Sequence, residues 1–341
     1  MHSNETKINK LFVNWLGLSL ILVFLIIIVG GLTRLTNSGL SITEWELFSG
    51  ILPPFNEKTW VEYFNLYKGI PQYKFLNPNM TLNEFKIIFY WEYYHRVLAR
   101  IIGLFFLIPL IYFYLSKKIK KEYMRICYFI FILIVFQGIV GWFMVKSGLV
   151  NNVTVSHYRL SIHLTIAILI ISSIFWLIRN IVTKNNKIFF KFSSNNLPFL
   201  LLILLVFAQI ILGAFVSGLD AGKIYQTWPK MGNTFIPNDL IVQNFVTFFD
   251  FNNHSLVQFY HRILAYVIVF YVLLLSIFIF KNKLVSLYMP IKILLFFLFL
   301  QATLGILTLI SDINIFIAST HQITSVLLVF SALNLYYLRA K

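Results

Sequence analysis

The sequence predicts an all-α membrane protein with eight transmembrane helices, arranged as two parallel four-helix bundles. Three observations predict this class: a low charge content, eight long apolar segments and an internal repeat. Of the 341 residues, 59% are hydrophobic and 12% are charged, whereas a soluble domain has about 25% charged residues. A soluble core cannot bury so much apolar surface, but a lipid bilayer accommodates it.

The apolar segments have the length of a membrane span, which is about 20 residues. The first segment is free of charged residues and follows a short polar N-terminus that has no features of a transit peptide. We therefore expect it to be retained as a helix. The eight predicted helices cover residues 11–33, 85–116, 126–145, 160–178, 199–219, 254–280, 293–310 and 313–338. A polar linker at 184–196 divides the chain into predicted halves 1–190 and 191–341.

The positive charge of the chain predicts its orientation. The net charge is +16, but the basic residues form short clusters between apolar segments, which disfavours nucleic acid binding. Cytoplasmic loops of membrane proteins collect Lys and Arg, and here most of them lie at both chain ends and in alternate connections. We expect both termini in the cytoplasm and the long loops 34–84 and 220–253 outside. A bacterial inner membrane is favoured, or the mitochondrial inner membrane for a eukaryotic source.

The chain repeats itself in order. The segment from Gly30 to Trp45 resembles a later segment with the same spacing of two glycines and a tryptophan, namely Gly213, Gly222 and Trp228. WEYYHR resembles VQFYHR, and FQGIVGW resembles LQATLGI. Such matches in one order predict a four-helix unit that is used twice, in parallel orientation because four is even.

Four histidines recur with this repeat, inside helices that enter the membrane from outside: His95, His163, His261 and His321. Ionisable groups within a membrane are costly and usually functional, although interhelical hydrogen bonding alone is the alternative. Zinc or copper would require a third ligand, and the second half offers none at that depth. Two histidines on facing helices suit the two axial positions of a haem iron.

Charged residues surround these histidines. Arg96, Arg262 and Arg159 could pair with haem propionates, or they could extend to lipid headgroups. His157 and His254 lie at helix entrances, where we expect an interfacial position; a proton or entry-gate role is the alternative. The single cysteine, Cys127, excludes an intrachain disulfide and disfavours a cysteine metal site.

The two halves differ at one position beside the histidines. Glu92 lies three residues before His95 on the same helix face, but Gln258 occupies that position before His261. A carboxylate can take up protons or stabilise a developing cation, and an amide cannot. One half therefore looks reactive and the other suits a stationary electron-transfer haem. A simple ion pair between Glu92 and Arg96 is the alternative role, and it is compatible with the first.

The ordered motifs resemble the haem A synthase family, in the branch shared by alphaproteobacteria and mitochondria. They are GGLTRLTNSGLSITEWELFSGILPP, EFKIIFYWEYYHR, QGIVGWFMVKSGL, SHYRLSIH, GLDAGKIYQTWP, VQFYHR and ASTHQ. The resemblance extends over about residues 15–335. Another branch of the family has a cysteine pair in the first outer loop, and loop 34–84 contains no cysteine, so thiol chemistry of that branch is not expected here.

The resemblance implies a membrane-bound oxidoreductase that converts haem O to haem A for cytochrome c oxidase. The methyl group at C8 is oxidised to a formyl group through successive hydroxylations. In this scheme His261 and His321 ligate a resident haem b. His95 and His163 flank the substrate haem, and Glu92 is catalytic.

The resemblance also implies partners, besides membrane lipid. These are haem O synthase, which is the protohaem farnesyltransferase, and assembly factors of cytochrome oxidase; homo-oligomerisation is left open. A second interpretation of the histidine pairs is a dihaem b-type cytochrome that transfers electrons from quinol. A haem transporter is the third, although transporters usually have broken helices near the membrane midplane.

Overall fold

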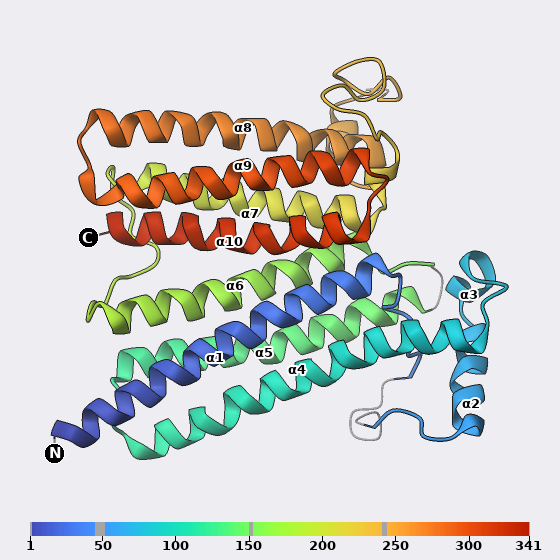
Figure 1. Ribbon diagram of the computed structural model, residues 1–341, viewed down its shortest axis with the longest axis horizontal. Helices are drawn as coiled ribbons and strands as arrows, with labels where there is room; N and C mark the ends of the chain where they lie inside the picture. Colours follow the sequence, from blue (N-terminus) through green and yellow to red (C-terminus); the bar gives the residue numbers. More distant parts are fainter. Residues whose placement is uncertain (1, 45–51, 150–152, 241–243, 341) are drawn as a thin grey trace. The chain divides into compact units, whose positions relative to one another are not determined.

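The computed structural model describes residues 2–44, 52–149, 153–240 and 244–340, which contain helices and one β-bridge but no strand. Eight helices in these ranges are long and apolar enough to cross a membrane, which confirms the predicted class (Figure 1). They are α1 (His2–Leu35), α4 (Leu82–Ser116), α5 (Lys121–Gly148), α6 (His157–Val182), α7 (Leu197–Gly218), α8 (His254–Lys281), α9 (Tyr288–Ile310) and α10 (Ile315–Arg339).

Most helix starts differ from the prediction by a few residues, and two of them differ for identifiable local reasons. Helix α4 begins at Leu82 because Thr81 and Glu84 form a capping box, in which each side chain bonds the backbone N–H of the other residue. Helix α10 begins two residues later than predicted. Asp312 and Ile313 have φ angles of 55° and 58° in the left-handed region, and the Asn314 side chain then caps the helix.

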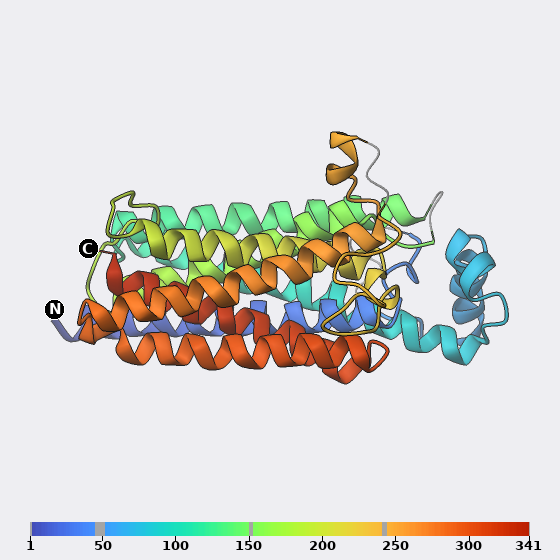
Figure 2. The same cartoon turned by 90° about the horizontal axis from the view of Figure 1, so that it is seen from above.

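The chain divides into two compact units, residues 1–178 and 179–341. In the first unit α4 packs along α1 and α5; in the second, α7 packs on α8 and α10, and α9 packs on α10. Figures 1 and 2 show that the long helices within each unit run side by side. Short 3-10 helices lie in the connections of the second unit: η2 (Ala221–Lys223), η3 (Phe245–Phe249) and η4 (Val285–Leu287). The parallel repeat and the boundary at residue 190 stay predictions.

The first outer loop contains two helices that the apolar pattern did not predict, α2 (Glu57–Lys68) and α3 (Pro71–Leu76). Asn56 caps α2 by accepting a hydrogen bond from the backbone of Thr59. Pro71 opens α3 at the position where its missing N–H costs nothing. In Figure 1 both helices lie beside the N-terminal end of α4.

An aromatic cluster joins these helices to α4. The ring of Trp60 meets Phe89 edge to face at 4.9 Å, and Phe64 and Tyr67 lie 5.1 and 5.2 Å from Phe85. Aromatic pairs at such distances add attraction to the burial of apolar surface.

Hydrogen bonds extend this cluster to the end of α1. The Tyr67 hydroxyl donates to Gln72 at 3.1 Å, and the Gln72 amide donates to the backbone carbonyl of Asn37 at 3.1 Å. Burial raises the pKa of the Tyr67 phenol, so this hydroxyl stays a donor. Helices α2 and α3 are thereby fixed to both helices that frame the first outer loop.

We predict that Phe85→Ala destabilises this outer cluster. Its side chain is fully buried, and removal of a buried phenylalanine ring costs about 3–5 kcal/mol. The midpoint of thermal unfolding in detergent should fall clearly. Phe75→Ala is the control because that ring is 75% exposed, and equal midpoints for the two variants would contradict the role given to the cluster.

Candidate functional site

Each of the four intramembrane histidines packs its ring against a glycine of the preceding long helix. The measure is the distance from the imidazole Cε1 to the position that a Cβ would take on the glycine. The pairs are Gly30 and His95 at 2.9 Å, Gly141 and His163 at 3.0 Å, Gly213 and His261 at 3.2 Å, and Gly305 and His321 at 2.9 Å. Any larger residue at these glycines would push the imidazole out of place.

The first unit places the rings of its two histidines next to each other. The ring centroids of His95 and His163 are 6.5 Å apart, with their planes at 61°. A metal–imidazole bond is about 2 Å long, and the ring centroid lies about 1 Å beyond the ligating nitrogen. Two rings that ligate one ion from opposite sides therefore have centroids about 6 Å apart. The spacing of this pair suits a single metal ion between the two rings.

The chemistry of the donors favours haem over a bare metal ion. Among the residues that the structure describes, no cluster of three or more His, Cys, Asp or Glu side chains could hold a metal. A haem iron needs only two axial protein ligands, because the macrocycle supplies the others. The Nδ1 atoms of His95, His163 and His261 are buried without a hydrogen-bond partner. The residues present therefore fit haem groups.

In the second unit, glutamine side chains contact both histidine rings. Gln209 Nε2 donates to the backbone carbonyl of His261 at 3.0 Å and lies 3.4 Å from the ring Nε2. Gln301 Nε2 lies 3.4 Å from Nε2 of His321, whose Nδ1 lies 3.1 Å from the Gln301 carbonyl oxygen. A partner at Nδ1 fixes the tautomer and orientation of a ligating imidazole.

The first unit has one glutamine that bonds the backbone of a histidine. Gln137 Nε2 donates to the backbone carbonyl of His163 at 3.0 Å. Gln137, Gln209 and Gln301 each lie four residues before the glycine on which a histidine packs. The amide and the glycine therefore share one face of their helix.

Glu92 is a buried carboxylate with hydrogen bonds to both oxygens. The residue is 3% exposed. Its Oε2 accepts from the Ser41 hydroxyl at 2.7 Å and from the backbone N–H of Ile42 at 2.9 Å. Its Oε1 accepts from Nη2 and Nε of Arg96, at 2.6 and 3.1 Å. The ion pair between Glu92 and Arg96 is thus present, and the carboxylate also holds the loop after α1.

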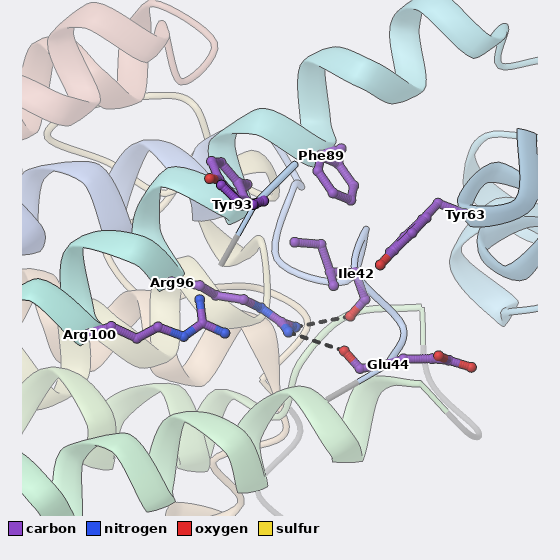
Figure 3. A pocket seen from close by; sticks show the side chains of 8 residues that line it. Ile42, Glu44, Tyr63, Phe89, Tyr93, Arg96 and Arg100 are labelled. Carbon is purple, nitrogen blue, oxygen red and sulfur yellow. Dashed lines mark hydrogen bonds between the residues drawn. The ribbon is translucent and has the colours of Figure 1, made fainter. Parts of the chain in front are cut away.

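Arg96 and Arg262 use the same arrangement in the two units. Arg96 donates to the carbonyls of Ile42 at 2.9 Å and of Glu44 at 3.4 Å (Figure 3). Arg262 donates to the carbonyls of Tyr225 at 2.7 Å and Thr227 at 2.8 Å. Both guanidinium groups thus bind the backbone of an outer loop, and their pairing with propionates stays a prediction.

The residue that corresponds to Glu92 contacts the same part of its own loop. Gln258 Nε2 donates to the carbonyl of Tyr225 at 2.9 Å. The two units therefore share an arginine and a polar side chain that hold the loop, and they differ in the charge of that side chain.

The remaining predicted residues lie near helix ends. Arg159 donates to the Phe143 carbonyl at 2.8 Å and lies 3.7 Å from the centre of its ring. His157 and His254 are the first residues of α6 and α8, at the predicted entrances. His157 is buried and its ring centroid lies 4.0 Å from that of Tyr158.

A small pocket lies at the outer part of α4, and no histidine lines it. Figure 3 shows Arg96 and Arg100 extending toward it from α4, with Tyr63 of α2 opposite. Its lining residues are Ile42, Glu44, Leu52, Tyr63, Phe89, Tyr93, Arg96 and Arg100. This pocket therefore borders the loop that Glu92 holds.

Sequence reasoning missed two groups of residues in this site. The three glutamines could have been found, because a glutamine four residues before a glycine recurs in three of the helices. Ser41 and Ile42 carried no such signal, because their role depends on the loop folding back onto α4.

Known proteins resemble this chain over nearly its whole length. The family model described as cytochrome oxidase assembly protein matches residues 13–333. A haem A synthase of Pelagibacter ubique is 48% identical, with 97% of each chain covered. Haem A synthases of Agrobacterium fabrum and Rickettsia africae are 42% and 40% identical, over 93% and 96% of this chain and 87% and 98% of theirs. The chain therefore belongs to the cytochrome oxidase assembly protein family, to which its ordered motifs had pointed.

Proposed function

We propose that the chain is a haem A synthase, which oxidises the C8 methyl group of haem O to a formyl group through successive hydroxylations. The observation that carries this proposal is the asymmetry between two glycine-packed histidine pairs. One pair has the carboxylate of Glu92 one helical turn away, and the other has the amide of Gln258. The names of the relatives support the same activity.

In this proposal His95 and His163 hold the iron of the substrate haem O. Their ring spacing of 6.5 Å supports a single iron between them. Glu92 lies on the same helix face as His95, one turn toward the outer side. Its carboxylate takes up a proton released from the methyl group or stabilises positive charge that develops there. Arg96, and Arg159 near the outer end of α6, are proposed to bind the propionates.

His261 and His321 are the proposed ligands of a resident haem b, with Arg262 at its propionates. When bound, this haem would carry electrons one at a time away from the substrate site. The backbone carbonyl of Gln301 contacts Nδ1 of His321, and such a contact keeps a ligating imidazole in one orientation. Gln209 donates to the backbone carbonyl of His261. A fixed ligand pair suits a haem that stays in the protein.

The eight apolar helices make this a multi-pass membrane protein. We infer that it lies in a bacterial inner membrane with both termini in the cytoplasm, so that the histidines lie in the outer half of the bilayer. Haem O synthase would supply the substrate there. Assembly factors of cytochrome oxidase would receive the product.

The function is tested by expression with and without the farnesyltransferase that makes haem O. We expect purified protein to contain b-type haem in both cases. Haem A should appear among the extracted haems only when haem O is supplied. Haem O that accumulates unchanged would contradict the proposal and favour a dihaem electron-transfer protein.

The catalytic role of Glu92 predicts that Glu92→Gln lowers conversion of haem O by about 10²–10⁴-fold, while bound haem is retained. Glutamine keeps the size of the side chain and can still accept bonds from Ser41 and Ile42. Ser41→Ala is the matched control, because it removes one of the hydrogen bonds to the carboxylate without changing its charge. Equal losses in both variants would mean that Glu92 acts only by holding the loop.

The ligand assignment predicts different spectra for two sets of variants. His261→Ala and His321→Ala should each lose the low-spin spectrum of haem b from protein purified without haem O, because an axial ligand is missing. His95→Ala and His163→Ala should keep that spectrum and lose conversion. The reverse result would exchange the roles of the two halves.

A further inference from the structure

A glutamine accompanies three of the four glycine–histidine contacts. Gln137, Gln209 and Gln301 precede their glycines by four residues, which is about one helical turn. In α1 the corresponding position, four residues before Gly30, is occupied by Ile26. Of the four glycine–histidine contacts, the one between Gly30 and His95 therefore has no glutamine one turn before its glycine.

The glutamine amides connect neighbouring helices at the level of the histidine. Gln137 and Gln209 each donate to the backbone carbonyl of their histidine at 3.0 Å. Gln301 contacts the ring of His321, and its Oε1 accepts a hydrogen bond from Thr324. Amide hydrogen bonds between helices oppose their separation within the membrane. The helix that carries such a histidine cannot move away from its neighbour without breaking this bond.

His95 has no equivalent restraint. Ile26 cannot donate a hydrogen bond, so this position of α1 offers no amide bond to α4. A side-chain bond between α1 and α4 runs from Thr33 to the Trp91 carbonyl, and at 3.4 Å it is long. A shorter one, from Trp15 to the Phe105 carbonyl, lies ten residues beyond His95 along α4, which is about 15 Å from that histidine.

We propose that His95 is the exchangeable axial ligand of the substrate site and that Gln137, Gln209 and Gln301 are positioning residues for the other three histidines. This proposal rests on the proposed function, because a substrate haem must enter and leave whereas a resident haem must not. Movement of His95 away from the iron opens one axial position on its side, while His163 keeps hold of the other.

The test measures ligand exchange at the iron directly. Protein loaded with haem O is reduced, carbon monoxide is added, and its rate of binding is followed by absorbance. Carbon monoxide binds a ferrous haem only where an axial ligand has moved away. We expect Ile26→Gln to slow binding about three- to tenfold, the size of one interhelical amide hydrogen bond in a membrane protein. Ile26→Leu is the matched control and should bind carbon monoxide at the unsubstituted rate.

The reciprocal variant removes an existing amide. Gln137→Ile frees His163 and should speed carbon monoxide binding by a similar factor, whereas Gln301→Ile in the second unit should leave the rate at the haem O site unchanged. An unchanged rate in either Ile26→Gln or Gln137→Ile would overturn the proposal. If Ile26→Gln fails to fold with haem, the rate in Gln137→Ile alone decides.

Conversion of haem O is scored separately by extraction of the haems from the same samples. Carbon monoxide rates that change as expected, in a chain that never forms haem A, would overturn the proposed function and leave the exchangeable role of His95 standing. Normal conversion of haem O with unchanged carbon monoxide rates would overturn the exchangeable role of His95 and leave the proposed function standing.

Discussion

The close approach of an imidazole ring to the backbone of a neighbouring helix is the contact on which the site depends. A glycine makes it possible in all four cases, since a Cβ would come within 3.2 Å or less of the ring. The contact fixes the spacing of each helix pair at the histidine, with the Cε1 edge of the ring against the glycine. The glutamine bonds act on a geometry that the glycine has already set.

The outer loops depend on the same helices. Arg96 and Arg262 directly follow a histidine of the site, and each binds carbonyls of the loop that leaves the preceding helix. The loop, the arginine and the histidine are therefore connected over one helical turn. A shift of the loop in either unit would therefore displace the arginine beside the histidine of that unit.

The sequence alone predicted the features that depend on residue type and spacing. Eight spans follow from apolar length, and the histidines and Glu92 follow from the cost of polar groups in a membrane. Helices α2 and α3 were missed because they are short and stabilised by an aromatic cluster formed through the fold. Ser41 and Ile42 were missed for a related reason, since the bond from Ile42 to Glu92 comes from its backbone and leaves no trace in its side chain.

The structure also bears on why a carboxylate stands beside His95. The ion pair with Arg96 was the simpler explanation, and that ion pair exists. However, Gln258 contacts the same part of its loop beside Arg262 without any charge. In the second unit a neutral polar side chain therefore suffices at this position of the loop. Burial of a carboxylate is costly unless it is well paired. The two hydrogen bonds at each oxygen of Glu92 offset this cost, and the proposed role of Glu92 in the chemistry of the first unit gives a reason for bearing it.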